Sequence, residues 1–145
     1  MSSQKPFAGL NLLVVEDEYL LADDIAAMAE SRGARVQMAN SVDGALALVQ
    51  RGDVDAAILD AGLRGTLSDA VAEQLAQQAI PTLVVTGYDR EALPPVLATL
   101  PYLCKPFSTV GLSSALEKLV SDAASGFSEP ETGQDRSGDA MQSNG

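Results

Sequence analysis

The sequence of 145 residues contains no histidine and no tryptophan, and its single cysteine is Cys104. Without histidine, the chain has no His-ligated zinc site, no nucleophile activated by histidine and no phosphohistidine. A single cysteine excludes an internal disulfide and a CxxC redox site, which fits a reducing compartment. Strand alternation places Cys104 on the face opposite Lys105, and we expect it to be a small core residue.

The chain also carries little positive charge. Nine basic residues accompany twenty acidic ones, so the net charge is −11. Nucleic acids and anionic membranes attract basic surfaces, so neither is expected as a primary ligand. No apolar run approaches the roughly 20 residues of a membrane span, and the first seven residues lack the apolar region of a signal peptide. We therefore expect a cytoplasmic protein that binds neither nucleic acid nor membrane.

The length and the 46% of hydrophobic residues predict one globular domain. We place this domain at residues 8–120 and expect residues 1–7 to be a flexible N-terminus. Residues 121–145 are rich in Ser, Gly, Asp, Glu and Gln, with five acids and one base. Because this segment has too few apolar residues to offset the entropy of ordering, it is predicted to be a disordered acidic tail.

Within the domain, short apolar runs alternate with amphipathic segments. Strands are predicted at residues 10–15, 35–39, 56–60, 80–85 and 101–105, and helices at 18–32, 41–52, 68–78 and 108–120. Pro94 and Pro95 prevent a long helix in residues 89–100, so the fourth helix is expected to be short or irregular. Five alternations of strand and helix predict an α/β fold, a doubly wound, mostly parallel sheet with helices on both faces.

Polar residues stand where the predicted strands end, and they are Glu16, Asp17, Glu18, Asp60, Thr86, Gly87, Lys105 and Pro106. In a doubly wound sheet the ligand crevice lies outside the carboxyl ends of the strands, so these groups are expected to meet at one rim. Clustered carboxylates repel one another unless a cation neutralises them, and oxygen ligands with open positions suit Mg²⁺. A carboxylate can also accept a phosphoryl group, with a lysine and a hydroxyl beside its oxygens. The set favours phosphoryl transfer onto Asp60.

Four stretches of the sequence resemble the signatures of a known family, namely Val14-Val15-Glu16-Asp17-Glu18, Ile58-Leu59-Asp60, Val84-Val85-Thr86-Gly87 and Lys105-Pro106-Phe107. In order and approximate spacing they resemble the signature stretches of CheY-like response regulator receiver domains, of the stand-alone, single-domain type. The resemblance implies a five-stranded parallel sheet of flavodoxin-like order 2-1-3-4-5. It also implies a phosphoprotein of two-component or phosphorelay signalling rather than an enzyme.

The resemblance implies roles for the acidic residues. Asp60 would be the phosphoacceptor. Mg²⁺ would be held by Glu16, Asp17, Asp60 and the backbone carbonyl of Gly62. Gly62 also occupies a position expected to tune the lifetime of the phosphorylated form.

The resemblance assigns further residues to the phosphoryl group and to a conformational switch. Thr86 would turn towards the phosphoryl group and Lys105 would pair with it, with a cis peptide bond between Lys105 and Pro106. Tyr102 would be the aromatic residue that moves with Thr86. Beyond the resemblance, we expect Tyr88, two residues after Thr86, to overhang the phosphoryl group and lengthen its lifetime by shielding it from water.

The chain departs from the receiver pattern at two places. Receivers often have proline four residues after the acceptor, where this chain has Arg64 in an unusual loop at residues 62–68. The fourth helix is also shortened. Residues 81–88 loosely resemble a stand-alone subgroup, found largely in alphaproteobacteria, with a Phe-Ala-Thr-Gly-Tyr-like run. That subgroup would imply a role in a general stress phosphorelay, although valines replace its Phe and Ala.

The missing histidine means that a histidine kinase or a histidine phosphotransfer protein would supply the phosphoryl group. No DNA-binding output domain fits in the 25 residues after position 120. The output is therefore expected to be one of three: binding to a downstream protein target, relay of the phosphoryl group, or action as a phosphate sink. The chain is expected to be a monomer or a weak dimer.

Two other functions remain open from the sequence. A pseudo-receiver that binds partners without phosphotransfer is favoured by the atypical loop and the interrupted fourth helix. A phosphatase with an aspartyl nucleophile is disfavoured because Gly62 stands where such enzymes carry a second aspartate. Each motif alone also has a plain structural explanation, as when acidic residues favour the first turn of a helix.

Overall fold

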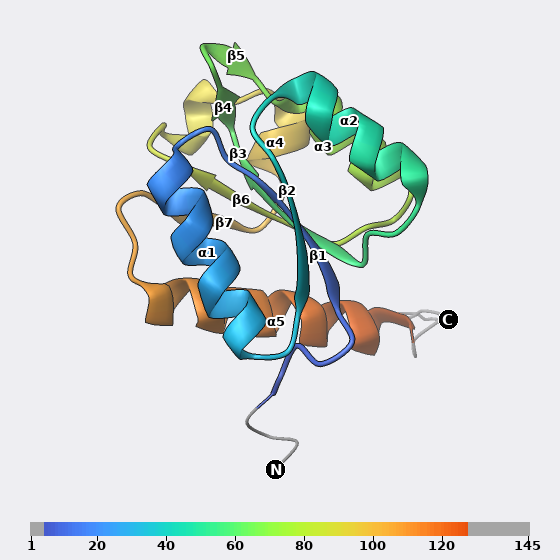
Figure 1. Cartoon of the computed structure of the whole chain (residues 1–145). Coiled ribbons are helices and arrows are strands. Elements are labelled where there is room, and N and C mark those ends of the chain that lie inside the picture. The colour runs from blue at the N-terminus through green and yellow to red at the C-terminus, as the bar shows by residue number, and fades with distance from the viewer. Residues whose placement is uncertain (1–4, 128–145) are drawn as a thin grey trace, which may run out of the picture.

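The computed structural model describes residues 5–127, which form a central sheet with helices on both faces (Figure 1). The sheet has five parallel strands in the order β2-β1-β3-β6-β7. The strands are β1 (Asn11–Val15), β2 (Arg35–Ala39), β3 (Ala56–Asp60), β6 (Thr82–Thr86) and β7 (Tyr102–Cys104). Because β4 and β5 form a separate small sheet, this order is the predicted flavodoxin-like order 2-1-3-4-5, which is confirmed.

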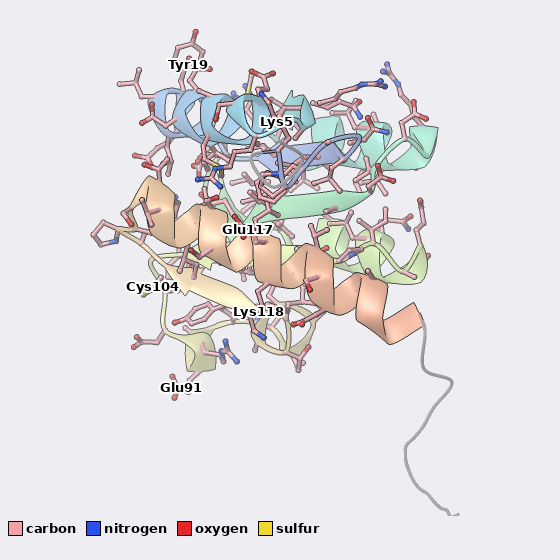
Figure 2. All side chains as sticks on the ribbon, turned by 90° about the horizontal axis from the view of Figure 1, so that it is seen from below. Lys5, Tyr19, Glu91, Cys104, Glu117 and Lys118 are labelled. Carbon is pink, nitrogen blue, oxygen red and sulfur yellow. The ribbon has the colours of Figure 1, made fainter. Side chains whose placement is uncertain are left out.

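Helices α1 (Tyr19–Ser31) and α5 (Thr109–Phe127) cover one face of the sheet. Helices α2 (Val42–Arg51), α3 (Asp69–Gln77) and α4 (Pro95–Ala98) cover the other. In the view from below, α5 lies across its face with Glu117 and Lys118 on its length (Figure 2). A separate hydrophobic core lies on each face of the sheet. Successive residues of β1 alternate between them, since Leu12 packs on the α1 and α5 side and Leu13 on the other. Burial on both faces explains why the central strands are continuously apolar.

The fourth helix is short, as predicted. A 3₁₀ turn, η2 (Arg90–Ala92), precedes α4, which has four residues and begins with Pro95 at its first position. Proline suits that position because its missing N–H has no partner in the first turn of a helix. Leu97 still buries its side chain completely, so the short helix covers its part of the core.

A small hairpin that the sequence pattern did not predict follows β3. Strands β4 (Gly62–Leu63) and β5 (Thr66–Leu67) pair antiparallel through a two-residue turn. The turn residues Arg64 and Gly65 have φ angles of 52° and 81°. Two positive φ angles match the twist of such hairpins, whereas proline is fixed near −65°. The turn geometry thus explains why this chain lacks the proline that receivers often have at this position.

The ordered domain is longer at both ends than the sequence predicted. Phe7 is only 1% exposed and packs in the core between the sheet and α1 and α5, so the N-terminal limit at residue 8 is wrong. Helix α5 continues to Phe127, so the prediction of disorder from residue 121 is wrong for residues 121–127. Ala123 and Ala124 extend a packed helix at little cost. The rest of the predicted tail, and residues 1–4, lie outside the described residues.

The prediction that Cys104 is a core residue is also wrong, because its side chain is exposed. Strand β7 has three residues and lies at the edge of the sheet. Cys104 and Tyr102 share one face of it, and the Tyr102 hydroxyl lies 4.0 Å from Cys104 Sγ. At this edge the face is only partly covered, since Tyr102 is half-buried while Cys104 is exposed, so strand alternation alone does not bury the thiol. No helix within residues 5–127 is long and apolar enough to cross a membrane.

Candidate functional site

The carboxyl ends of the central strands bring three acidic side chains together. Glu16 and Asp17 follow β1, and Asp60 ends β3. One carboxylate oxygen from each of the three lies within 4.8 Å of the other two. Glu16 and Asp60 are buried, whereas Asp17 is exposed. The sequence-predicted acidic set therefore forms one cluster at the expected rim of the sheet.

Asp60 is fixed at both carboxylate oxygens. The backbone N–H of Gly62 donates to Oδ1 at 3.0 Å, and Lys105 Nζ donates to Oδ2 at 2.8 Å. The hydroxyl of Ser68, which is fully buried, donates to the backbone carbonyl of Asp60 at 2.6 Å. These bonds hold the end of β3 and leave the Asp60 carboxylate in one orientation, 6% exposed, at the floor of the site.

Lys105 stands among the carboxylates at the end of β7. Its Nζ lies 2.8 Å from Asp60, 3.1 Å from Glu16 and 3.6 Å from Glu18. Burial acts to lower the pKa of Lys105, but the hydrogen bonds and charges of Asp60 and Glu16 outweigh it and raise the pKa above its ordinary value. Lys105 is therefore positively charged at neutral pH. The peptide bond between Lys105 and Pro106 is cis, as the resemblance implies.

Glu16 is the carboxylate most affected by burial. Its removal from water is the main cause of a pKa raised to about 7; the nearby Asp60 acts in the same direction, and the N–H of Glu18 and the positive charge of Lys105 oppose the rise. Glu18 N–H donates to Glu16 Oε2 at 3.0 Å. The other oxygen, Oε1, is buried and lies 3.1 Å from Lys105 Nζ, and within the described part of the chain this ion pair is its one polar contact.

The donor set fits Mg²⁺. All candidate ligands are oxygens, and three carboxylates with one lysine leave the cluster with excess negative charge. In the hairpin, Leu63 and Thr66 form the pair next to the turn, and Gly62 and Leu67 form the next pair along the ladder. Because an antiparallel ladder alternates, the backbone groups of Gly62 point away from β5. Its N–H bonds Asp60, and its carbonyl is left as a candidate ligand.

A pocket of about 340 Å³ opens above Asp60. The β4–β5 hairpin forms one wall and the segment after β6 forms another, and the lining residues are Asp17, Asp60, Gly62, Arg64, Gly65, Thr66, Leu67, Gly87, Tyr88 and Lys105. The Tyr88 ring packs against Gly62. Two residues predicted to affect the lifetime of the phosphorylated form therefore lie next to each other at this site.

Thr86 is buried at the end of β6, and its hydroxyl is engaged locally. Thr86 Oγ1 accepts a hydrogen bond of 2.9 Å from the backbone N–H of Tyr88. The hydrogen bonds of residues 5–127 include none between Thr86 and Asp60. The structure thus places the predicted hydroxyl at the rim, facing the start of the next loop.

Tyr102 lies outside this pocket, on β7, where its half-buried side chain packs against the core on the α4 side. The guanidinium of Arg90 is 4.4 Å from the centre of the Tyr102 ring. The hydrogen bond to Cys104 is the main cause that raises the pKa of Tyr102, with burial second. Because Thr86 bonds Tyr88 and Arg90 contacts Tyr102, residues 86–90 connect the rim with the acidic cluster to this tyrosine.

Sequence analysis did not assign roles to three residues that shape the site. Ser68 was recognised only as a helix start, whereas its hydroxyl holds Asp60. Arg64 appeared as a departure from a pattern, whereas its backbone N–H donates to Asp17 at 2.8 Å. Arg90 had no signal at all, because its contact with Tyr102 depends on how the interrupted fourth helix folds back.

A sequence model described as the response regulator receiver domain matches residues 12–117. The chain is 31% identical over 114 residues to the sensory transduction protein RegX3 of Mycolicibacterium smegmatis, a match that covers 76% of this chain and 50% of that protein. RegX3 of Mycobacterium tuberculosis strain H37Rv is 30% identical over 132 residues, with 88% and 58% covered. The chain thus spans about half the length of the curated relatives it matches.

Solved structures agree with the fold. The solution structure of SdrG from Sphingomonas melonis Fr1 is 38% identical and superposes with a TM-score of 0.64, covering 77% of this chain and 96% of that one. A CheY-like receiver from Methanospirillum hungatei has a TM-score of 0.73 at 19% identity, covering 81% and 98%. The receiver domain of NtrX from Brucella abortus has a TM-score of 0.67 at 22% identity, covering 77% and 98%.

Proposed function

The chain belongs to the response regulator receiver domain family, and from this premise we propose that Asp60 accepts a phosphoryl group in a two-component or phosphorelay pathway. The observation that carries the proposal is the environment of Asp60. Its carboxylate is buried beside Glu16 and Asp17 and is bonded by Lys105 at 2.8 Å. This arrangement meets the requirements for phosphoryl transfer to a carboxylate, which are a fixed nucleophile and positive charge near the transferred oxygens.

The proposed donor is a phosphohistidine of a histidine kinase or a histidine phosphotransfer protein. A carboxylate oxygen of Asp60 attacks the phosphorus atom and forms a P–O bond, and the P–N bond breaks with its electron pair remaining on the imidazole. The product is an acyl phosphate on Asp60. Because this sequence contains no histidine, the donor residue lies outside it. The chain is in this proposal a signalling phosphoprotein, and not an enzyme with a separate substrate.

Glu16, Asp17, Asp60 and the backbone carbonyl of Gly62 would hold Mg²⁺ in this proposal. When bound, Mg²⁺ neutralises the negative charge of the carboxylates and of the incoming phosphoryl oxygens. Lys105 supplies a second positive charge, and its raised pKa keeps this charge at neutral pH. Tyr88 covers one side of the pocket and keeps water from the acyl phosphate.

Phosphorylation would be transmitted through Thr86 and Tyr102. To reach a phosphoryl oxygen, the Thr86 hydroxyl gives up the bond in which it accepts the N–H of Tyr88. The loop that begins at Tyr88 leads to Arg90, whose guanidinium lies over the Tyr102 ring. A change at Thr86 therefore changes the surface formed by η2, α4 and β7.

We further propose that this receiver acts alone and signals by binding a protein target, by relay or as a phosphate sink. A monomer or weak dimer, and the subgroup with a Phe-Ala-Thr-Gly-Tyr-like run and its stress phosphorelay, stay predictions. The complete acidic cluster and Lys105 favour phosphotransfer over a pseudo-receiver.

Incubation with acetyl phosphate and Mg²⁺, followed by intact-mass spectrometry, tests the acceptor. We expect one phosphoryl group on the wild-type chain and on the Asp53→Asn control, which changes an exposed aspartate on the loop after α2. Asp60→Asn should carry none. Labelling that persists in Asp60→Asn would overturn the acceptor assignment, and a wild-type chain that neither takes up phosphate nor binds beryllofluoride would favour the pseudo-receiver.

A further inference from the structure

The metal-binding carboxylate of Asp17 is held by the hairpin that replaces the usual loop after β3. We infer that residue 64 is a positioning residue for the divalent-cation site, through its backbone N–H and its left-handed conformation. This inference rests on the proposed function, because it concerns the same Mg²⁺ site. It adds a residue that belongs neither to the predicted ligands nor to the phosphoryl-binding groups.

The hydrogen bond from Arg64 N–H to Asp17 Oδ2 measures 2.8 Å. Within residues 5–127 this is the only hydrogen bond of the Asp17 side chain, and Asp17 takes part in no ion pair of that region. Asp17 is exposed, so without this bond its carboxylate is free to rotate in water. The bond occupies one carboxylate oxygen and leaves the other for a cation, which is how outer partners fix metal ligands.

The position of this N–H depends on the turn. Arg64 and Gly65 both have positive φ angles, and the resulting two-residue hairpin directs the N–H of Arg64 towards the end of β1. The Arg64 side chain adds a second anchor, because Nε donates to the carbonyl of Asn40 at 3.1 Å. Asn40 follows β2, so the hairpin connects the segments that follow β1, β2 and β3 at one rim.

The backbone and side-chain contributions of residue 64 are separable. Glycine keeps the N–H, adopts a positive φ freely and removes the side chain. Proline removes the N–H and is fixed at negative φ. If the backbone positions Asp17, Arg64→Gly retains cation affinity and Arg64→Pro loses it. If the guanidinium were responsible, both substitutions would lose it.

Ala79 provides a matched control. It is the other non-glycine residue with a positive φ in the described chain, at 57°, and its N–H donates to the carbonyl of Ala76 at 3.0 Å. It lies between α3 and β6, at the amino end of the sheet, opposite the acidic cluster. Ala79→Pro therefore imposes the same backbone change as Arg64→Pro without touching Asp17.

Calorimetric titration with Mg²⁺ on the full chain measures the effect. We expect Arg64→Pro to weaken Mg²⁺ binding by about tenfold, the lower end of what loss of an outer partner costs a metal site. Arg64→Gly and Ala79→Pro should stay within about twofold of wild type. Equal affinity of Arg64→Pro and wild type would overturn the inference alone, whereas absence of Mg²⁺ binding by wild type would overturn the proposed function and this inference with it.

A second measurement does not depend on folding of the proline variant. Amide hydrogen exchange of residue 64 in the metal-free wild type should be slowed by its bond to Asp17. Asp17→Ala should accelerate this exchange at least several-fold, and Asp23→Ala, which removes a neighbouring exposed carboxylate on α1, should not. Unchanged exchange in Asp17→Ala would overturn the inference.

Discussion

The ring of Tyr88 lies against Gly62, two residues after the proposed phosphoacceptor. A Cβ atom built on Gly62 would lie 3.4 Å from Cε2 of Tyr88 and 3.6 Å from its hydroxyl oxygen. The ring is 52% exposed, so one side faces solvent while the other covers the pocket. A Cβ at position 62 would thus touch the ring at ordinary contact distance, and we expect both residues to affect how closely water approaches Asp60.

Removal of the ring is expected to shorten the lifetime of the phosphorylated chain. Tyr88→Ala opens one wall of the pocket, and water can then reach the acyl phosphate from that side. We expect hydrolysis to be up to about tenfold faster, which corresponds to about 1.4 kcal/mol of activation free energy. The decay is measured by intact mass after removal of acetyl phosphate. Tyr19→Ala, which removes a tyrosine that projects from the start of α1 (Figure 2), should leave the decay unchanged.

A larger side chain at position 62 should act through the same ring. Gly62→Ala places its Cβ at ordinary contact distance from Tyr88, whereas the methyl groups of Gly62→Val displace the ring. We expect Gly62→Val to accelerate hydrolysis in the wild-type background and to have little further effect in Tyr88→Ala. Contacting residues give such non-additive effects. Additive effects in the double variant would show that Gly62 and Tyr88 act independently.

Mg²⁺ affinity should depend on pH through Glu16. Burial raises the pKa of this carboxyl from 4.5 to about 7, and the cation binds its deprotonated form. Between pH 6 and pH 8 the affinity should therefore rise by about tenfold, since binding releases one proton. Calorimetric titration at several pH values measures this slope, and Glu16→Gln should flatten it. A slope in Glu16→Gln equal to that of wild type would assign the proton to another group.

The same raised pKa affects stability without metal. A carboxyl whose pKa is higher in the folded chain stabilises the fold at low pH, and that contribution is lost as the pH rises from 4.5 through about 7. Added Mg²⁺ should therefore increase the free energy of unfolding more at pH 8 than at pH 6.

Phe7 should contribute to the core despite its place near the N-terminus. Its side chain is 1% exposed, and its N–H donates to the carbonyl of Arg32 at 2.9 Å. We expect Phe7→Ala to lower the free energy of unfolding by about 3–5 kcal/mol in urea denaturation. Leu20→Ala, at a site 76% exposed, should change it by less than about 0.5 kcal/mol. A loss below about 1 kcal/mol for Phe7→Ala would place residue 7 outside the cooperative core.

The central sheet could be predicted because its strands are buried on both faces. Strands β1, β3 and β6 are continuously apolar for that reason, and their polar residues fall at the ends. The hairpin could not be predicted in the same way. Its turn lacks the Asn-Gly or Asp-Gly signal, and Arg64 adopts a conformation that is rare for arginine. The bonds to Asp17 and Asn40 that support it come from distant parts of the chain.

The residues of the candidate site likewise fall into those that could be located from the sequence and those that could not. Asp60 and Lys105 could be located from sequence because strand order places the ends of β3 and β7 at one rim. The contact of Arg90 with Tyr102 could not, because it depends on the packing of a short, interrupted segment. The end of α5 was missed since the Ser, Ala and Gly residues beyond position 120 give no apolar periodicity, although the helix continues.

The exposed thiol at the sheet edge makes the native chain ready for labelling. Cys104 is the only cysteine in the sequence, so a thiol-reactive fluorophore attaches at one defined place without any engineered substitution. That place directly precedes Lys105 and lies 4.0 Å from the Tyr102 hydroxyl. The fluorescence of a dye at this position should respond to changes in β7, which lies between the acidic cluster and the protein surface. It can be followed in real time in a mixture with unlabelled partners.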